Sequence, residues 1–170
     1  MWHREGMEEL RLRPPRHLVS PRAVWYWTAR AAVPWLLLVV AQVAWLVMAP
    51  DGLAPWRQLA LAVTVVAAIA HLLVMPRWRY RVHRWEATPD AVYTQAGWFD
   101  QRRRIAPVSR VQTVDSERGP LEQLFGLANV TVTTASAAGP LKIEGLDHAT
   151  AQHLVDELAS ATEALRGDAT

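Results

Sequence analysis

The sequence contains no cysteine. Disulfide bonds, thiolate nucleophiles and cysteine-based metal sites are therefore excluded as sources of stability or chemistry. Two long stretches, Ala31 to Met48 and Leu59 to Met75, also contain no Asp, Glu, Lys or Arg. Each is close to the roughly 17–25 residues that a helix needs to cross the hydrocarbon core of a bilayer. These stretches predict a membrane-spanning helical hairpin near the start of the chain.

The usual signals of enzyme chemistry are missing as well. The sequence has no glycine-rich phosphate loop, and Ser109 has no nucleophile-elbow context. His148 and His153 are five residues apart on an expected helix, so they do not share a face as zinc ligands at i and i+4 would. Asp115 and Glu117 share one face of an expected strand, but no partner base accompanies them. We expect no enzymatic activity, no cofactor and no metal.

Tryptophan, by contrast, is abundant, with nine residues in 170. Tryptophan concentrates at membrane–water interfaces, where its amphipathic ring suits a half-hydrated layer. Five tryptophans flank or end the two apolar stretches, and we expect them at such interfaces: Trp25, Trp27, Trp45, Trp56 and Trp78. Trp85 and Trp98 lie farther along the chain and are expected in a protein core.

A secretory signal peptide is the competing explanation for the first apolar stretch. A signal peptide has a hydrophobic region of about 7–15 residues behind a short basic segment. Here 30 residues precede a stretch of 18, and a second apolar stretch follows. We therefore expect an uncleaved membrane hairpin.

The distribution of charge predicts its orientation. Residues 1–30 carry six arginines against three glutamates, and residues 76–118 carry nine arginines against five acidic residues. The connector from Ala49 to Arg57 has one Asp and one Arg. Because basic residues near spans favour the cytoplasmic side, both termini are expected in the cytoplasm, with a tight external turn at 49–52.

The chain accordingly divides into four predicted parts. Residues 1–22 form a polar arm, in which Glu8 to Leu12 could be a short helix that Pro14 and Pro15 end. Residues 23–76 form the hairpin, with spans at about 31–48 and 59–75. Residues 77–166 form a small mainly-β domain, and residues 167–170 a tail.

The β-domain is predicted from a change of periodicity after Pro76. Arginines alternate with Trp78, Tyr80 and Val82, which is the period-2 pattern of a half-buried strand. Further strands are expected at 91–95, 98–105, 108–115, 130–134 and 141–143, with a helical turn at 121–125. Asp147 is a plausible N-cap for a last amphipathic helix. Antiparallel strands followed by one helix predict a small barrel or sandwich that the helix plugs.

Several segments in this order resemble a known family. They are Gly97-Trp98-Phe99, the basic run Arg102 to Arg104, the segment Ile105 to Gln112, the segment Gly119 to Leu127 and the segment Ile143 to Asp147. Together with the preceding hairpin, they resemble the bacterial pleckstrin-homology-like domain of the YdbS type. The resemblance implies two packed antiparallel sheets capped by a C-terminal helix, and no enzymatic activity. It also implies a membrane-bound accessory or interaction protein of the bacterial inner membrane, in some cases tied to envelope stress or antimicrobial resistance.

A cluster of arginines is the candidate binding site for headgroups or a partner. Its members are Arg77, Arg79, Arg81, Arg84, Arg102, Arg103 and Arg104. Near an anionic leaflet, each basic residue contributes about 1 kcal/mol of attraction, which decays within a Debye length. Arg77 to Arg84 admit two interpretations, because arginines beside a span also serve orientation alone. Arg102 to Arg104 lie too far along the chain for that role, which favours a solvated or lipid-facing strand.

Two other binding hypotheses are weaker. The alternation places Trp78 and Tyr80 opposite the arginines, whereas nucleic-acid stacking needs aromatic and basic groups on one face. Gln42 and His71 are the strongly polar residues in the spans, and polar groups within a membrane raise a functional question. At a rise of 1.5 Å per residue they lie about 10 Å apart in depth, which argues against a direct bond or a relay between them.

The sequence thus predicts a non-catalytic, membrane-anchored interaction module at the cytoplasmic face. Its expected partners are the lipid bilayer with its anionic headgroups, further copies of the chain or a partner membrane protein, but no nucleic acid. The alternative is a small transport or resistance component in which the spans themselves act.

Overall fold

A computed structural model of the chain describes residues 14–48, 54–97, 101–136 and 139–167. Its elements, in chain order, are β1 (His17–Leu18), α2 (Arg22–Met48), α3 (Pro55–Val82), β2 (Arg84–Ala87), β3 (Ala91–Ala96), β4 (Arg102–Pro107), the 3₁₀ helix η1 (Val108–Arg110), β5 (Val111–Glu117), α4 (Pro120–Leu124), β6 (Leu127–Thr134), β7 (Leu141–Asp147) and α5 (His148–Gly167). The predicted helix at 8–12, the external turn at 49–52, and Trp98 and Phe99 lie outside the described residues.

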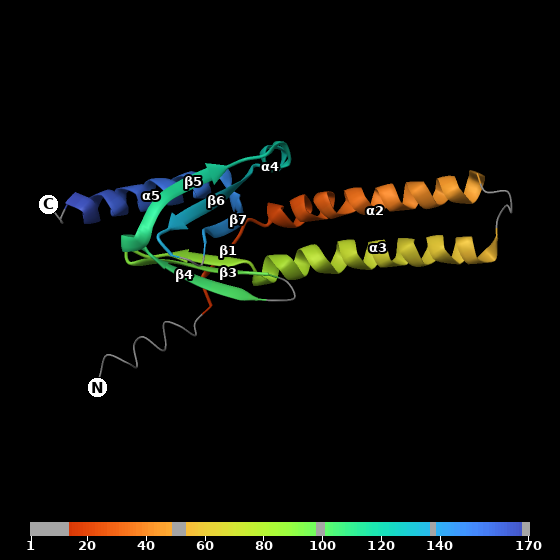
Figure 1. The fold of residues 1–170 in the computed structure, drawn as a ribbon, viewed down its shortest axis with the longest axis horizontal. Helices are drawn as coiled ribbons and strands as arrows, with labels where there is room; N and C mark the ends of the chain where they lie inside the picture. The colour runs from red at the N-terminus through yellow and green to blue at the C-terminus, as the bar shows by residue number, and fades with distance from the viewer. Residues whose placement is uncertain (1–13, 49–53, 98–100, 137–138, 168–170) are drawn as a thin grey trace, which may run out of the picture.

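The two long helices form an antiparallel hairpin that extends away from the β-domain (Figure 1). They have 27 and 28 residues, and both are long and apolar enough to cross a membrane. Side-chain hydrogen bonds join them: the Trp35 Nε1–H donates to His71 Nδ1 at 2.8 Å, and Gln42 Nε2 donates to Thr64 Oγ1 at 3.0 Å. Gln42 and His71 thus bond to different residues of the facing helix, which agrees with the predicted separation between them.

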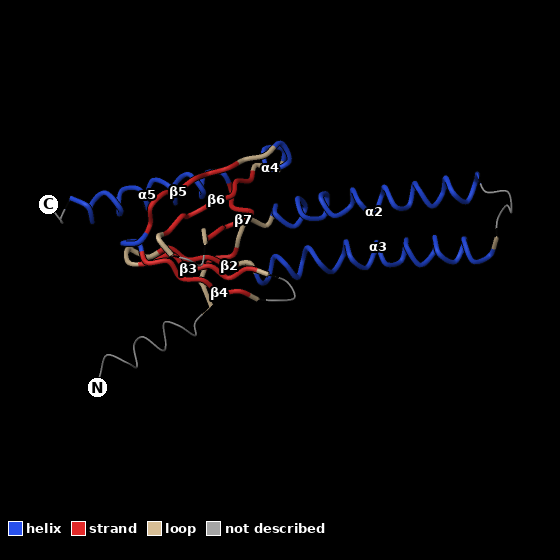
Figure 2. The backbone as a smooth tube through the Cα atoms, in the orientation of Figure 1, coloured by secondary structure: helices blue, strands red, loops and turns tan. Residues whose placement is uncertain are grey.

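The β-domain consists of two antiparallel sheets, as predicted. One sheet has the strand order β1-β2-β3-β4 and the other the order β5-β6-β7. Figure 2 shows the strands gathered at one end of the molecule, with the hairpin leading away from them. Val92 and Ala106 from the first sheet and Val130 and Val132 from the second are buried in a common core. Helix α5 adds the buried stripe Ala151, Leu154 and Leu158, so one amphipathic helix closes the two sheets.

The predicted strand over 77–82 is wrong, because α3 continues through this segment to Val82. The backbone N–H of His83 donates to the Arg79 carbonyl at 2.9 Å and closes the last helical turn. In helical geometry Arg77 and Arg81 share a face while Arg79 points the opposite way. The alternation of arginine and apolar residues therefore fits a helix with two faces as well as a strand. The packing of this segment against the rest of the protein determines that it is a helix.

The predicted boundary of the β-domain also needs correction, because the arm and the start of α2 belong to it. His17 and Leu18 pair with Trp85 and Arg84 as an edge strand. Val19, Ala23, Tyr26 and Trp27 are buried in the core. A domain that began at Arg77 would therefore lack one strand and part of its own interior.

The five tryptophans that flank or end the apolar stretches divide into one that is buried in the β-domain and four that are exposed. Trp27 is 2% exposed inside the β-domain, so its predicted interfacial position is wrong. Trp25, Trp45, Trp56 and Trp78 keep between 48% and 67% of their surface exposed, and for them the interfacial position stays a prediction. At the outer end of the hairpin, the Arg57 guanidinium lies 5.1 Å from the ring centroids of both Trp45 and Trp56.

Candidate functional site at the junction of hairpin and domain

The structure divides the seven candidate arginines between exposed and partly buried positions. Arg77, Arg81, Arg102 and Arg103 are exposed. Arg77 also donates to the Leu73 carbonyl one helical turn earlier, at 2.7 Å. The other three, Arg79, Arg84 and Arg104, are partly buried. The predicted cluster is therefore not one uniform patch.

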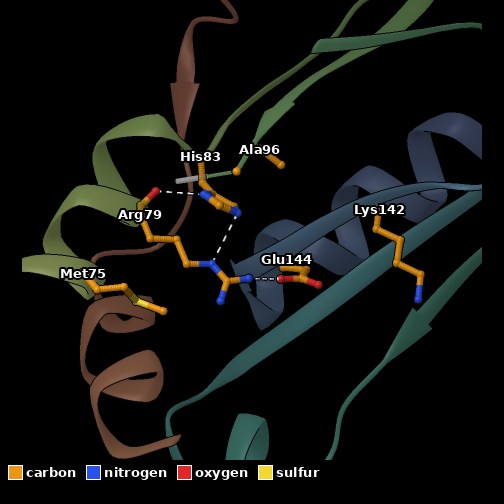
Figure 3. Close-up of a pocket in the computed structure, with 7 residues that line it drawn as sticks. Met75, Arg79, His83, Ala96, Lys142 and Glu144 are labelled. Carbon is orange, nitrogen blue, oxygen red and sulfur yellow. Dashed lines mark hydrogen bonds and ion pairs between the residues drawn. The ribbon is translucent and has the colours of Figure 1, made fainter. Parts of the chain in front are cut away.

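Arg79 fixes the end of α3 to the β-domain. Its Nη2 donates to Glu144 Oε2 of β7 at 2.6 Å, and its guanidinium lies 4.5 Å from the ring centroid of Trp27 on α2. Figure 3 shows the Arg79 side chain extended between the helix and the strand, with His83 above it. One side chain thus connects both membrane helices to the second sheet. Arg79 is a structural residue, and its charge is already neutralised by Glu144.

His83 completes this joint between α3 and β2. Its Nδ1 lies 2.8 Å from the Arg79 carbonyl, and its ring centroid lies 5.1 Å from that of Trp27. Burial lowers the pKa of His83, and the neighbouring positive charge of Arg79 lowers it further. The imidazole is consequently held in its neutral form at pH 7.

A hollow of about 350 Å³ lies beside this joint. It is lined by Met75, Arg79, His83, Ala96, Gly97, Lys142 and Glu144, most of which Figure 3 labels. The Lys142 side chain points away from the Arg79–Glu144 pair (Figure 3). Among the described residues, no group of three or more His, Cys, Asp or Glu residues could hold a metal ion. The hollow contains the Arg79–Glu144 ion pair and a neutral histidine, and these groups join α3 to the β-domain.

The arginines of β2 and β4 lie on the first sheet. Gln95 of β3 pairs with Arg84 on one side and with Arg103 on the other, so the two arginines are two strand spacings apart, about 10 Å. Arg102 pairs with Ala96, which lines the hollow near Met75, and this places the start of β4 at the hairpin end of the domain (Figure 1). Arg104 donates to the carbonyls of Gly139 and Pro140 at 2.8 and 2.6 Å.

A second joint, which the arginine pattern did not reveal, connects α2 with α4. Glu122 Oε1 accepts hydrogen bonds from the Tyr26 hydroxyl at 2.8 Å and from Asn129 Nδ2 at 3.2 Å. Burial works to raise the pKa of Glu122, but these hydrogen bonds and the charge of Arg30 outweigh it, so the pKa lies below its usual value. The segment 119–127 predicts a helical turn and carries part of the family resemblance, but no pattern in it indicates a bond to Tyr26.

These features define a class of protein: a membrane hairpin built without a linker into a two-sheet β-domain that a C-terminal helix closes. Residues 25–162 match the family model of the Bacterial PH domain, where PH denotes pleckstrin homology, and the chain belongs to this family. The resemblance and the fold class inferred from the sequence are thereby confirmed.

A curated relative supports the membrane assignment. The chain is 33% identical over 98 residues to the UPF0699 transmembrane protein YdbS of Bacillus subtilis (strain 168). The aligned region covers 58% of this chain and 60% of that protein, so the match spans less than two thirds of the relative. No solved structure matches the chain.

Proposed function

We propose that this protein is a non-catalytic interaction module of the bacterial inner membrane, with two spans and both termini in the cytoplasm. The hairpin fixes the β-domain at the inner leaflet, where it contacts anionic headgroups and offers its outer surface to a protein partner. The proposed biological role of this module is in envelope stress or antimicrobial resistance.

One observation carries the proposal: exposed arginines lie at the end of the β-domain that joins the hairpin. Arg77 is two residues beyond the second charge-free stretch, and Arg81 lies one helical turn farther on the same face. Arg102 and Arg103 are exposed at the start of β4. This arrangement supports contact with negatively charged headgroups, which attract each basic residue by about 1 kcal/mol at low salt.

The preference of the full chain for anionic lipid tests the headgroup contact. The chain is reconstituted in phosphatidylcholine vesicles, and the fraction of motionally restricted spin-labelled phosphatidylglycerol is compared with that of spin-labelled phosphatidylcholine. We expect a preference for phosphatidylglycerol that weakens at high salt. Substitution of the four exposed arginines, Arg77, Arg81, Arg102 and Arg103, by glutamine should reduce it several-fold.

The matched control is Arg110→Gln. Arg110 is also exposed, but it lies in η1 at the other end of β4, away from the hairpin. This control should leave the lipid preference unchanged. Equal effects of the two variants, or no preference for phosphatidylglycerol at low salt, would contradict the headgroup contact.

The structure gives less support to the alternative of a transport component. The His71 ring accepts a hydrogen bond from Trp35, and Gln42 donates one to Thr64, so both polar side chains serve to join the two helices. Polar contacts of this kind stabilise helix association in membranes. These two hydrogen bonds fit the role of an anchor, although Gln42 Oε1 is buried with no hydrogen-bond partner among the described residues.

A further inference from the structure

The short helix α4 carries two exposed leucines. Leu121 is 41% exposed and Leu124 is 76% exposed. Residues three apart share a face of a helix, so the two side chains form one apolar surface. Scattered apolar residues on a protein surface need no special explanation. These two leucines are of interest because they lie close to the expected membrane surface.

Helix α4 lies beside α2 close to the point where α2 enters the bilayer. The Glu122 carboxylate is bonded to the Tyr26 hydroxyl, and Tyr26 is five residues before the charge-free stretch begins at Ala31. Five residues of helix correspond to about 7.5 Å. The headgroup layer on each side of the hydrocarbon core is roughly 5–8 Å thick. Figure 1 shows α4 at the end of the domain from which α2 leaves.

The exposure of the leucines does not come from a loose loop. The backbone N–H of Gln123 donates to the Gly119 carbonyl at 3.0 Å, that of Phe125 donates to the Leu121 carbonyl at 3.1 Å, and Gly126 ends the segment with a φ of +67°. Phe125 packs against the core, and its ring forms a T-shaped pair with that of Tyr26 at a centroid distance of 6.3 Å. These contacts hold α4 in place on one side while its leucines stay uncovered on the other.

Helix α2 also exposes an apolar side chain near α4. Trp25 precedes Tyr26 and is 67% exposed, so a large apolar ring lies at the same height as α4. Tryptophan at this level is typical of the membrane interface. The two leucines and Trp25 are thus exposed apolar side chains at a similar distance from the start of the charge-free stretch.

We propose that α4 inserts Leu121 and Leu124 into the interfacial layer of the bilayer that α2 crosses. Helix α4 then makes a third contact with the membrane beside those of α2 and α3. Because α4 lies to one side of the hairpin, the three contacts together fix the tilt of the β-domain. This inference requires only that α2 spans the membrane. It holds whether or not the arginines bind anionic headgroups.

Because the chain has no cysteine, single labelled positions can test this in the full protein. Leu124→Cys is labelled with an environment-sensitive fluorophore and reconstituted in uncharged phosphatidylcholine vesicles at a low protein-to-lipid ratio. We expect its emission at shorter wavelength than that of a label in water. Lipids with a nitroxide near the headgroup should quench it more strongly than lipids with a nitroxide at the chain end.

Three labelled controls calibrate the result. Val40→Cys, on an exposed position of α2 within the span, should be quenched best by the deep nitroxide. Glu163→Cys, on the end of α5 far from the hairpin, should report water. Gln123→Cys is exposed on a different face of α4 itself and should be quenched less than Leu124→Cys.

Two outcomes would overturn the proposal. A Leu124 label that behaves like the Glu163 label would show that the leucines face water. A label that is shielded but insensitive to both nitroxide lipids, and that becomes exposed when the protein is diluted in lipid, would identify a second copy of the chain as the occupant. Neither outcome depends on the arginines, since the vesicles carry no anionic lipid.

Discussion

Replacement of Trp27 by alanine tests whether the start of the first membrane helix is part of the β-domain. Trp27 lies on α2, but it is 2% exposed and its ring contacts the joint formed by Arg79 and His83. Trp25, two residues away on the same helix, is 67% exposed. If both tryptophans served membrane anchoring alone, their replacement should affect the stability of the β-domain similarly. In the structure only Trp27 is buried in this domain, so we expect different effects.

The expected loss of stability follows from the contacts of the ring. Truncation of a buried tryptophan costs about 3–5 kcal/mol through lost transfer energy and the cavity that remains. Loss of the contact with the Arg79 guanidinium adds about 0.5–2 kcal/mol. The exposed Trp25→Ala variant should stay within about 0.5 kcal/mol of the unchanged protein.

The reactivity of a buried thiol measures this difference in the membrane-embedded protein. Val132→Cys places one thiol at a fully buried position of β6, in a chain that otherwise has none. Because each 1.4 kcal/mol corresponds to a factor of ten, Trp27→Ala should accelerate labelling by at least about 100-fold. Trp25→Ala should leave the rate nearly unchanged. Equal rates in the two variants would refute the integration of α2 into the core.

Further predictions concern a glycine, a histidine and the hairpin. Gly145 has a φ of +79° and a Cβ there would lie 2.9 Å from that of Ala23, whereas Gly139 has a φ of +75° with open space around it. In both alanine variants the positive φ should lower the free energy of unfolding by about 1–2 kcal/mol. In G145A overpacking should lower it by about 1–3 kcal/mol more, so that G145A has a lower Tm than G139A. Because the pKa of His83 is lowered in the folded state, the unfolded state binds more protons below about pH 6.5. The Tm should therefore fall as the pH drops below this value, and H83Q should flatten that dependence. Finally, Q42L should weaken helix association by roughly 0.6 kcal/mol, measured by urea unfolding in micelles against the exposed control V43L.

The sequence predicted those features that rest on long, regular patterns. The charge-free stretches revealed the hairpin, since little but a bilayer tolerates such surfaces. The apolar stripe of Ala151, Leu154 and Leu158 identified α5. The β-branched run from Val130 to Thr134 predicted a strand, and it lies within β6, where Val130 and Val132 are buried. In each case the local pattern and the tertiary environment agree.

The candidate site was predicted less well because its members depend on contacts between distant segments. Arg79 was expected among headgroup-binding residues, but Glu144, 65 positions later, draws it into the joint. The Tyr26–Glu122 bond connects residues 96 positions apart, and no local pattern indicates it. The continuation of α3 past Pro76 likewise reflects packing, since an alternation of arginine and aromatic residues fits either a strand or a helix with two faces.

The absence of a linker gives these joints a mechanical consequence. Only His83 separates the end of α3 from the start of β2, and Ala23 at the start of α2 is completely buried in the β-domain. A change of tilt in either helix must therefore move the β-domain with it or break contacts of Trp27, Arg79 and Tyr26. Packed interiors resist gradual deformation, so the domain should follow the hairpin as a rigid body. A partner that binds the outer surface of the domain would then meet it at a height and orientation set by the membrane.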